Sequence, residues 1–398
     1  MPPLSKFSSY PFAAVSQFDA VLDAAWQRSY ATNKKNEPDF VKHLVSDTTI
    51  DELNQVAASI YDPAHNLVHF RGGFLHGYPR ATFRAAGPGQ RITCVRELAD
   101  ALFVRYVTAP GPTGGITVVE RSACMLMFKC SGAGAPQTLA FQPGVQKLPT
   151  GKKGSDQQQF YLFNRWPRFK LQDGKKRYRF ALRPPKVNGT QPLLHDIGKF
   201  GVLWEPKKGN TCPWNVSGNK FHWMFSDPLP GKAMSVMAPA DSLGFFLDQL
   251  VDGIAGFGRP FTPLQPSVLP NVGDWNQLMG FLLGSPMSLN VGYLETHEGG
   301  FNGTRDANPA ARHFVTWRGE QLEKFALHIA KIAAITEDKD ELHYYLGTGR
   351  WDRFFLKARP PQSTGTAVPP VYRMPRKEDA SKGLPILIAT VNQLAPYG

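Results

Sequence analysis

Three histidines lie close together near the start of the chain, at His65, His69 and His76, and Asp62 precedes them. Imidazole and carboxylate groups bind transition metals and transfer protons as general acids or bases. A metal site needs three or four such ligands converging on one point. The apolar segment 67–70 predicts a strand, and ligands spread along a strand need not converge. We therefore expect no metal and no cofactor, and His76 stays a candidate catalytic residue.

A second group of candidate catalytic residues comprises Glu295, His297 and Glu298, followed directly by two glycines. Carboxylates and an imidazole in a glycine-rich loop are typical of functional loops, although turns share this composition. With Arg71 at the end of an expected strand, the late glutamates resemble the ADP-ribosyltransferases in outline. That family has an early arginine that binds the dinucleotide and a catalytic Glu-x-Glu motif, from which the spacing here departs. We do not assign the chain to that family.

These residues define the alternative function, an enzyme that acts on an acidic substrate. It would be a nuclease or an ADP-ribosyltransferase-like toxin. No P-loop, GxGxxG, GxSxG, HExxH or EF-hand motif occurs in the sequence. The main prediction is therefore a protein without enzymatic activity.

The strongest signal is a concentration of positive charge. The chain has 45 Lys and Arg against 32 Asp and Glu, a formal net charge of +13. Between Lys147 and Lys186, twelve basic residues face only Asp156 and Asp173, so this stretch alone carries a net +10. Such clustering is typical of surfaces that bind polyanions, nucleic acid above all, because guanidinium groups bind phosphate bidentately.

Within this basic stretch, Asp173-Gly174 predicts a hairpin with a type I′ turn. With those two residues as the loop, Lys170 faces Arg177 and Arg168 faces Arg179. Strand alternation places these cations on one face and the neighbouring apolar side chains on the other. Like charges opposite each other are destabilising, and a bound polyanion would relieve them.

We expect the hairpin to hold backbone phosphates while nearby aromatic side chains stack on bases. The candidate nucleic-acid-binding residues are Arg165, Trp166, Arg168, Lys170, Lys175, Lys176, Arg177, Tyr178, Arg179 and Arg183.

The elements that must position these residues are predicted from hydrophobic periodicity. Helices and strands do not alternate regularly enough for a doubly wound sheet, so the sequence predicts the α+β class, with mixed helices and short antiparallel strands around a β-rich basic central region. Helices are expected over 15–30, 48–60, 94–107, 240–257 and 320–335, and strands over 67–70 and 116–129.

The 398 residues exceed what one core usually organises. We predict a mixed α/β N-terminal region over 1–146 and a basic β-rich region over 147–235, with its hairpin at 168–180. A mostly helical C-terminal region over 236–398 would include an extended linker at 360–370.

The sequence also carries expectations about location and partners. Residues 1–11 show no uninterrupted apolar run, and the 4 cysteines form no CxxC pair, so we expect a cytoplasmic protein with reduced thiols and no membrane partner. Our leading hypothesis is a nucleic-acid-binding protein, for RNA or DNA, acting as a subunit of a nucleoprotein complex with other protein subunits. A third hypothesis is a structural protein of an assembly, whose basic face meets acidic protomers.

Overall fold

The computed structural model of the chain describes residues 4, 11–31, 37–62, 65–73, 79–87, 90–111, 115–131, 155–173, 176–182, 196–204, 223–226, 242–264, 271–284, 287–290, 314–317, 327 and 385–393. Helices and strands both contribute to this part of the chain, and the strands form two separate sheets of mixed direction. The predicted α+β class is confirmed.

The larger sheet has nine strands. Its order is β13 (Phe314–Trp317), β12 (Met287–Asn290), β1 (Asn66–Gly73), β14 (Ile386–Gln393), β4 (Ala101–Pro110), β5 (Ile116–Ser131), β8 (Gly198–Trp204) and β9 (Trp223–Ser226), and β10 (Arg259–Pro260) also pairs with β5. The β14–β4 and β5–β8 pairs are parallel, and the other pairs are antiparallel. Strand β14 therefore lies between two strands of the N-terminal region. Strands from all three regions expected from the sequence join this sheet.

The smaller sheet has five strands. Its order is β11 (Val272–Gly273), β7 (Lys176–Phe180), β6 (Phe169–Asp173), β2 (Arg80–Gly87) and β3 (Gln90–Glu97). Strand β11 runs parallel to β7, and all other neighbours are antiparallel.

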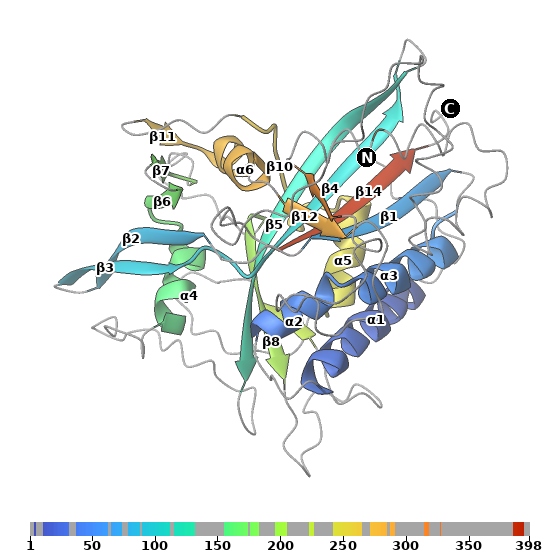
Figure 1. Cartoon of the computed structure of the whole chain (residues 1–398), viewed down its shortest axis with the longest axis horizontal. Coiled ribbons are helices and arrows are strands. Elements are labelled where there is room, and N and C mark those ends of the chain that lie inside the picture. Colours follow the sequence, from blue (N-terminus) through green and yellow to red (C-terminus); the bar gives the residue numbers. More distant parts are fainter. Residues whose placement is uncertain are drawn as a thin grey trace.

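Different layers pack on the two faces of the larger sheet, and Figure 1 shows the blue N-terminal helices on one side of it and the smaller sheet on the other. One face packs against α1 (Pro11–Ala31), α2 (Glu37–Leu44), α3 (Asp47–Ile60) and α5 (Leu243–Asp252). The other face shares a core with α4 (Ser155–Arg165), α6 (Trp275–Gly284) and the inner side of the smaller sheet. Alternation along β4 shows the division, because Phe103 belongs to the first core and Val104 to the second.

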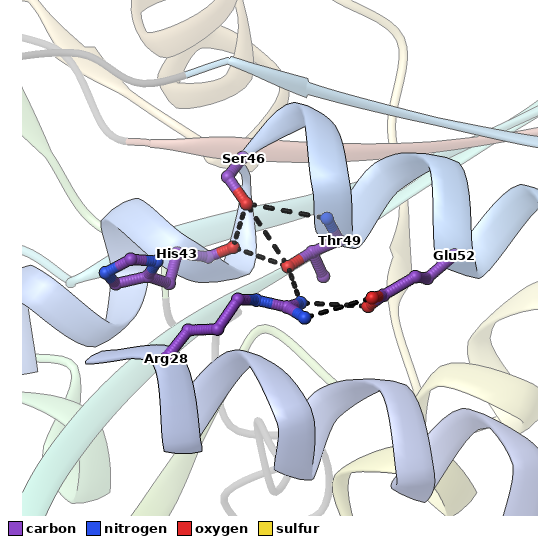
Figure 2. Close-up of polar contacts among 5 residues, drawn as sticks. All are labelled: Arg28, His43, Ser46, Thr49 and Glu52. Atoms are coloured by element: carbon purple, nitrogen blue, oxygen red, sulfur yellow. Dashed lines mark hydrogen bonds and ion pairs between the residues drawn. The ribbon is translucent and has the colours of Figure 1, made fainter. Parts of the chain in front are cut away.

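Polar contacts join α1 to α3 within the helical layer (Figure 2). The Arg28 guanidinium donates to both carboxylate oxygens of Glu52, at 3.0 and 2.9 Å, and to Thr49 Oγ1 at 2.8 Å. Ser46 is the N-cap of α3, and its Oγ donates to the His43 carbonyl at 2.7 Å. The cap fixes where α3 begins, and the ion pair fixes its position against α1.

A buried arginine connects the larger sheet to the end of α5. Arg105 of β4 is fully buried, and its Nε donates to the Val251 carbonyl at 2.8 Å while its Nη1 pairs with Glu120. Burial lowers the pKa of Arg105, and the Glu120 carboxylate opposes that shift. Gly253 ends α5 at φ 73°, and a Cβ there would lie 2.8 Å from Arg105 Nη2. The glycine thus leaves room for the guanidinium at the helix C-terminus.

Several predicted elements are confirmed, and one is wrong. The helices expected over 15–30 and 48–60 are α1 and α3, and the one expected over 240–257 is the shorter α5. The strands expected over 67–70 and 116–129 are β1 and β5. The helix expected over 94–107 is instead the end of β3 and most of β4. A strand buried on both faces has an almost continuous apolar run, and such a run also contains residues at helical spacing.

Two predicted segments lie wholly or almost wholly outside the described residues. The helix expected over 320–335 falls outside the described residues except at Leu327, which is helical. The linker expected at 360–370 lies wholly outside them.

Candidate nucleic-acid interface

The smaller sheet turns its aromatic side chains inward. Phe83, Phe169, Tyr178 and Phe180 are all buried, and they pack against α4 and α6. The Tyr178 and Phe281 ring centroids lie 5.0 Å apart. These contacts fix which side of the sheet faces the core, so the alternate residues of each strand point outward.

One row of residues crosses the outer side from edge to edge. Val95 pairs with Thr82, Thr82 with Lys170, Lys170 with Arg179, and Arg179 with Val272. Because residues paired across neighbouring strands share a side of the sheet, all five point outward. The two valines at the ends of the row are 45% and 41% exposed, which confirms that this side is open to solvent among the described residues.

Further cations flank this row on the same side. Arg80 and Arg84 lie two residues before and after Thr82 on β2, and Arg177 lies two residues before Arg179 on β7. Arg80, Arg84, Lys170 and Arg177 are exposed, and Arg179 is half-buried. We call Arg80, Arg84, Lys170, Arg177 and Arg179 the basic face. Three neighbouring strands therefore direct positive charge to one side.

The basic face has little acidic compensation. Within the described part of the chain, no Asp or Glu forms an ion pair with any of its members. Glu97, opposite Arg80 in register, is the acidic residue that the described parts of the five strands place on this side. By contrast, Arg28, Arg105 and Arg259 each pair with a carboxylate, and the Arg259–Asp196 distance is 2.8 Å. The charge of the basic face is thus left to solvent or to a ligand.

The predicted hairpin is present, but its register differs from the prediction. Lys170 pairs with Arg179 and Gln172 with Arg177, so the two residues between the strands are Gly174 and Lys175. The prediction that Lys170 faces Arg177 is therefore wrong. A glycine at the first of two loop positions suits a type II′ turn, whereas the prediction assumed type I′.

The observed register changes which charged residues face each other, but it does not change the side of the sheet to which each residue points. Each partner moves by two residues, which is one full repeat of the strand, so Lys170, Arg177 and Arg179 still point the same way. The predicted pair of Arg168 with Arg179 is wrong, because Arg168 precedes β6 and Arg179 pairs with Lys170. At the hairpin end, Asp173 is the register partner of Lys176.

The remaining candidates are divided between surface and core. Arg165, Arg168 and Lys176 are exposed. Trp166 and Tyr178 are only 1% and 6% exposed, so the structure does not offer their rings to a base. Lys175 and Arg183 lie outside the described residues.

Sequence reasoning missed Arg80 and Arg84 because they lie far from the charge cluster along the chain. A signal was present. Residues 80–85 alternate between polar and apolar types, the period of a half-buried strand. That alternation would have placed both arginines on the solvent side of a strand.

The candidate catalytic residues are not brought together by the described part of the chain. His65 is exposed, with its Nδ1 2.7 Å from Asp62 Oδ2, whereas His69 is buried in β1. Among the described residues, no three His, Cys, Asp or Glu side chains gather to hold a metal ion. His76, Glu295, His297 and Glu298 lie outside those residues.

The alternative enzymatic hypothesis would require Arg71 and the segment after β12 to lie near each other, and strand pairing addresses this in part. Strand β12 ends at Asn290, shortly before Glu295, and it pairs with β1 through Leu289 and Gly73. Arg71 lies two residues before Gly73 and is buried. The alternative enzymatic function stays a prediction.

Comparison with protein-family models, with curated proteins and with solved structures found no match for this chain. In the segments that the structure covers, every helix is too short or too polar to cross a membrane.

Proposed function

We propose that this protein binds nucleic acid and that the basic face holds its phosphates. The observation that supports the proposal is the set of five cationic side chains on one side of a packed sheet, without ion-pair partners in the described part of the chain. The inner side of that sheet is fixed by aromatic packing. A ligand would therefore meet cations whose strands are already in place, which lowers the entropic cost of binding.

The types of the cationic residues favour phosphate as the group that is bound. Four of the five members of the basic face are arginines, at 80, 84, 177 and 179. Guanidinium presents a planar fork of donors that matches two phosphate oxygens, and it is less strongly hydrated than an ammonium group. The overall charge of +13 would also steer a polyanion toward the protein.

A lipid surface is a poorer match than nucleic acid. Peripheral membrane surfaces combine cations with large apolar side chains such as Trp, Phe and Leu that enter the bilayer. The exposed large apolar residues that the described strands add here are Val95 and Val272, at opposite edges of the sheet. Valine is smaller than Trp, Phe or Leu, and these two valines lie far apart, so they do not form a surface that could insert into a bilayer.

Phosphate binding predicts a steep dependence of affinity on salt. Each neutralised phosphate contributes about −0.7 to −0.9 to the slope of log K against log salt. Five such contacts would give a slope of about −3.5 to −4.5. The same slope is expected for unrelated sequences, because phosphates carry no base information.

The test is a fluorescence anisotropy titration of labelled oligonucleotides, of about 20 nucleotides, between about 50 and about 200 mM KCl. Arg177→Gln should reduce the slope by about 0.7–0.9 for every sequence tested. Lys42→Gln is the matched control. Lys42 is half-buried on α2, on the opposite side of the larger sheet, and loses the same charge.

Three outcomes would overturn the proposal. The first is no binding at the lower salt concentration. The second is an equal effect of Arg177→Gln and Lys42→Gln. The third is Arg177-dependent binding to phosphatidylserine vesicles without binding to oligonucleotides, which would assign the basic face to lipid. Circular dichroism melting of each variant shows that a loss of binding is not a loss of fold.

A further inference from the structure

We infer that the preferred ligand of the basic face is a nucleic-acid duplex rather than a single strand. The inference rests on the proposed function and adds to it the strandedness of the ligand. Two independent features of the smaller sheet support it, namely the side on which its aromatic residues lie and the spread of its cations.

The first feature is the segregation of aromatic from cationic side chains. All four aromatic residues in the described parts of the five strands, Phe83, Phe169, Tyr178 and Phe180, face the core. Surfaces that bind single strands gain much of their affinity by stacking bases on exposed rings. The described outer side of this sheet offers no ring for stacking, so unpaired bases gain nothing there.

The second feature is the spread of the cations in two dimensions. Arg80 and Arg84 are four residues apart on β2, about 13 Å along the strand. Arg177 and Arg179 lie on β7, two strands away, at about 10 Å across the sheet. Lys170 lies on β6, between β2 and β7.

A single strand follows one line and would contact the cations of one strand or one row. A duplex presents two phosphate rows on either side of a groove, which is about 6 Å wide for the minor and about 12 Å wide for the major groove of B-form DNA. Cations on β2 and β7 can therefore meet phosphates of both rows at once. A duplex also has the higher charge density and releases more counterions per contact.

The same geometry leaves the bases unread. Between the arginines of β2 stands Thr82, which is half-buried and short. The face of a sheet several strands wide does not enter a groove as a single helix does. We therefore expect duplex binding that is independent of sequence.

The experiment is a competition measurement at fixed salt. A labelled duplex bound to the full-length protein is displaced by unlabelled duplex, or by single strands of unstructured sequence, with concentrations counted per nucleotide. Single strands should compete at least about fivefold less well, the effect of roughly 1 kcal/mol of missing stacking. Single strands that compete equally or better overturn the inference and leave the proposed function standing. A protein that binds neither ligand overturns both.

A gain-of-function variant tests the physical reason separately. Thr82→Trp places a ring among the cations of the basic face and should raise single-strand affinity about fivefold or more, with a smaller effect on duplex. Val119→Trp is the control, because Val119 is 51% exposed on β5 of the other sheet and lacks these surrounding cations. If Thr82→Trp leaves single-strand affinity at the level of Val119→Trp, missing stacking is not the reason for the preference, and the inference fails.

Discussion

Lys170 of β6 lies directly opposite Arg179 of β7 in the antiparallel register, and neither forms an ion pair with a described carboxylate. Side chains that face each other across a strand pair have Cβ atoms about 5 Å apart. The two cationic side chains extend to the same side from these neighbouring positions, so their charges repel each other, although water screens the repulsion. The folded protein thus keeps two like charges as cross-strand neighbours on the surface proposed to bind phosphate.

Lys170→Gln is predicted to stabilise the unliganded protein by about 0.2–1 kcal/mol while weakening its binding to nucleic acid. The gain should shrink as salt rises, because screening already relieves the repulsion. Urea unfolding at low and high KCl measures it. Lys176→Gln is the control, since Lys176 lies on the same strand as Arg179 but has no basic residue opposite it in register, so its removal should not stabilise the fold. Equal effects of the two substitutions would contradict the prediction.

Arg105→Met is predicted to destabilise the fold by about 3 kcal/mol, because it leaves the Val251 carbonyl and Glu120 without their donor. Thermal unfolding followed by circular dichroism measures the loss. Arg259→Gln provides the comparison. The ion pair of Arg259 with Asp196 is partly exposed, with side chains 21% and 25% accessible, and its loss should cost about 0–1 kcal/mol. Similar losses for both variants would be evidence against a structural role for the buried arginine.

Tyr61→Phe is predicted to flatten the loss of stability at alkaline pH. Burial, with the nearby carboxylates of Asp248 and Asp252, raises the pKa of Tyr61 well above its usual value. The native state then holds this proton more tightly than the unfolded chain. The stabilisation is complete below the unfolded pKa of about 10 and is lost as pH rises above it.

The fall in melting temperature between about pH 8 and about pH 10.5 should be smaller for Tyr61→Phe than for the unsubstituted protein. At neutral pH the variant should lose about 1–3 kcal/mol, because Tyr61 Oη donates to Asp248 at 3.2 Å inside the protein. Identical alkaline slopes for the two proteins would show that this tyrosine is not the group responsible.

Cys94 and Cys124 are predicted to resist alkylation in the native protein. Both thiols are free and buried, and burial raises the pKa of Cys94, which lowers the fraction of reactive thiolate. Treatment with iodoacetamide followed by peptide mass spectrometry should find these two unmodified at neutral pH. In urea, all 4 cysteines should react. Rapid native labelling of Cys94 would show that the sheet opens at β3.

Local patterns were sufficient to predict which side of the hairpin is basic, because alternation along a strand does not depend on its partner. Thus Lys170 and Arg177 share a side in either register. The register itself depends on which two residues form the connection, and Asp-Gly and Gly-Lys are both acceptable turns. The sequence offered no local reason to choose between them.

The contribution of β2 to the candidate site required tertiary information. Arg84 and Lys170 are 86 positions apart, and it is the pairing of Thr82 with Lys170 that brings their strands together. The burial of Trp166 was also beyond local reasoning. A Cβ at Gly198 would lie 2.7 Å from Trp166 Cζ2, so the indole packs directly on the backbone of a strand that comes later in the chain.

The central position of β14 has a consequence for how this protein is made. Asn392 donates to the carbonyl of Leu67, a partner 325 positions away. While the ribosome is still translating the intervening chain, β1 and β4 cannot receive the strand that separates them, and their facing edges stay open to other chains. The nine-stranded sheet can be completed only after residues 386–393 have left the exit tunnel, so we expect partly synthesised chains to expose strand edges that the finished protein covers.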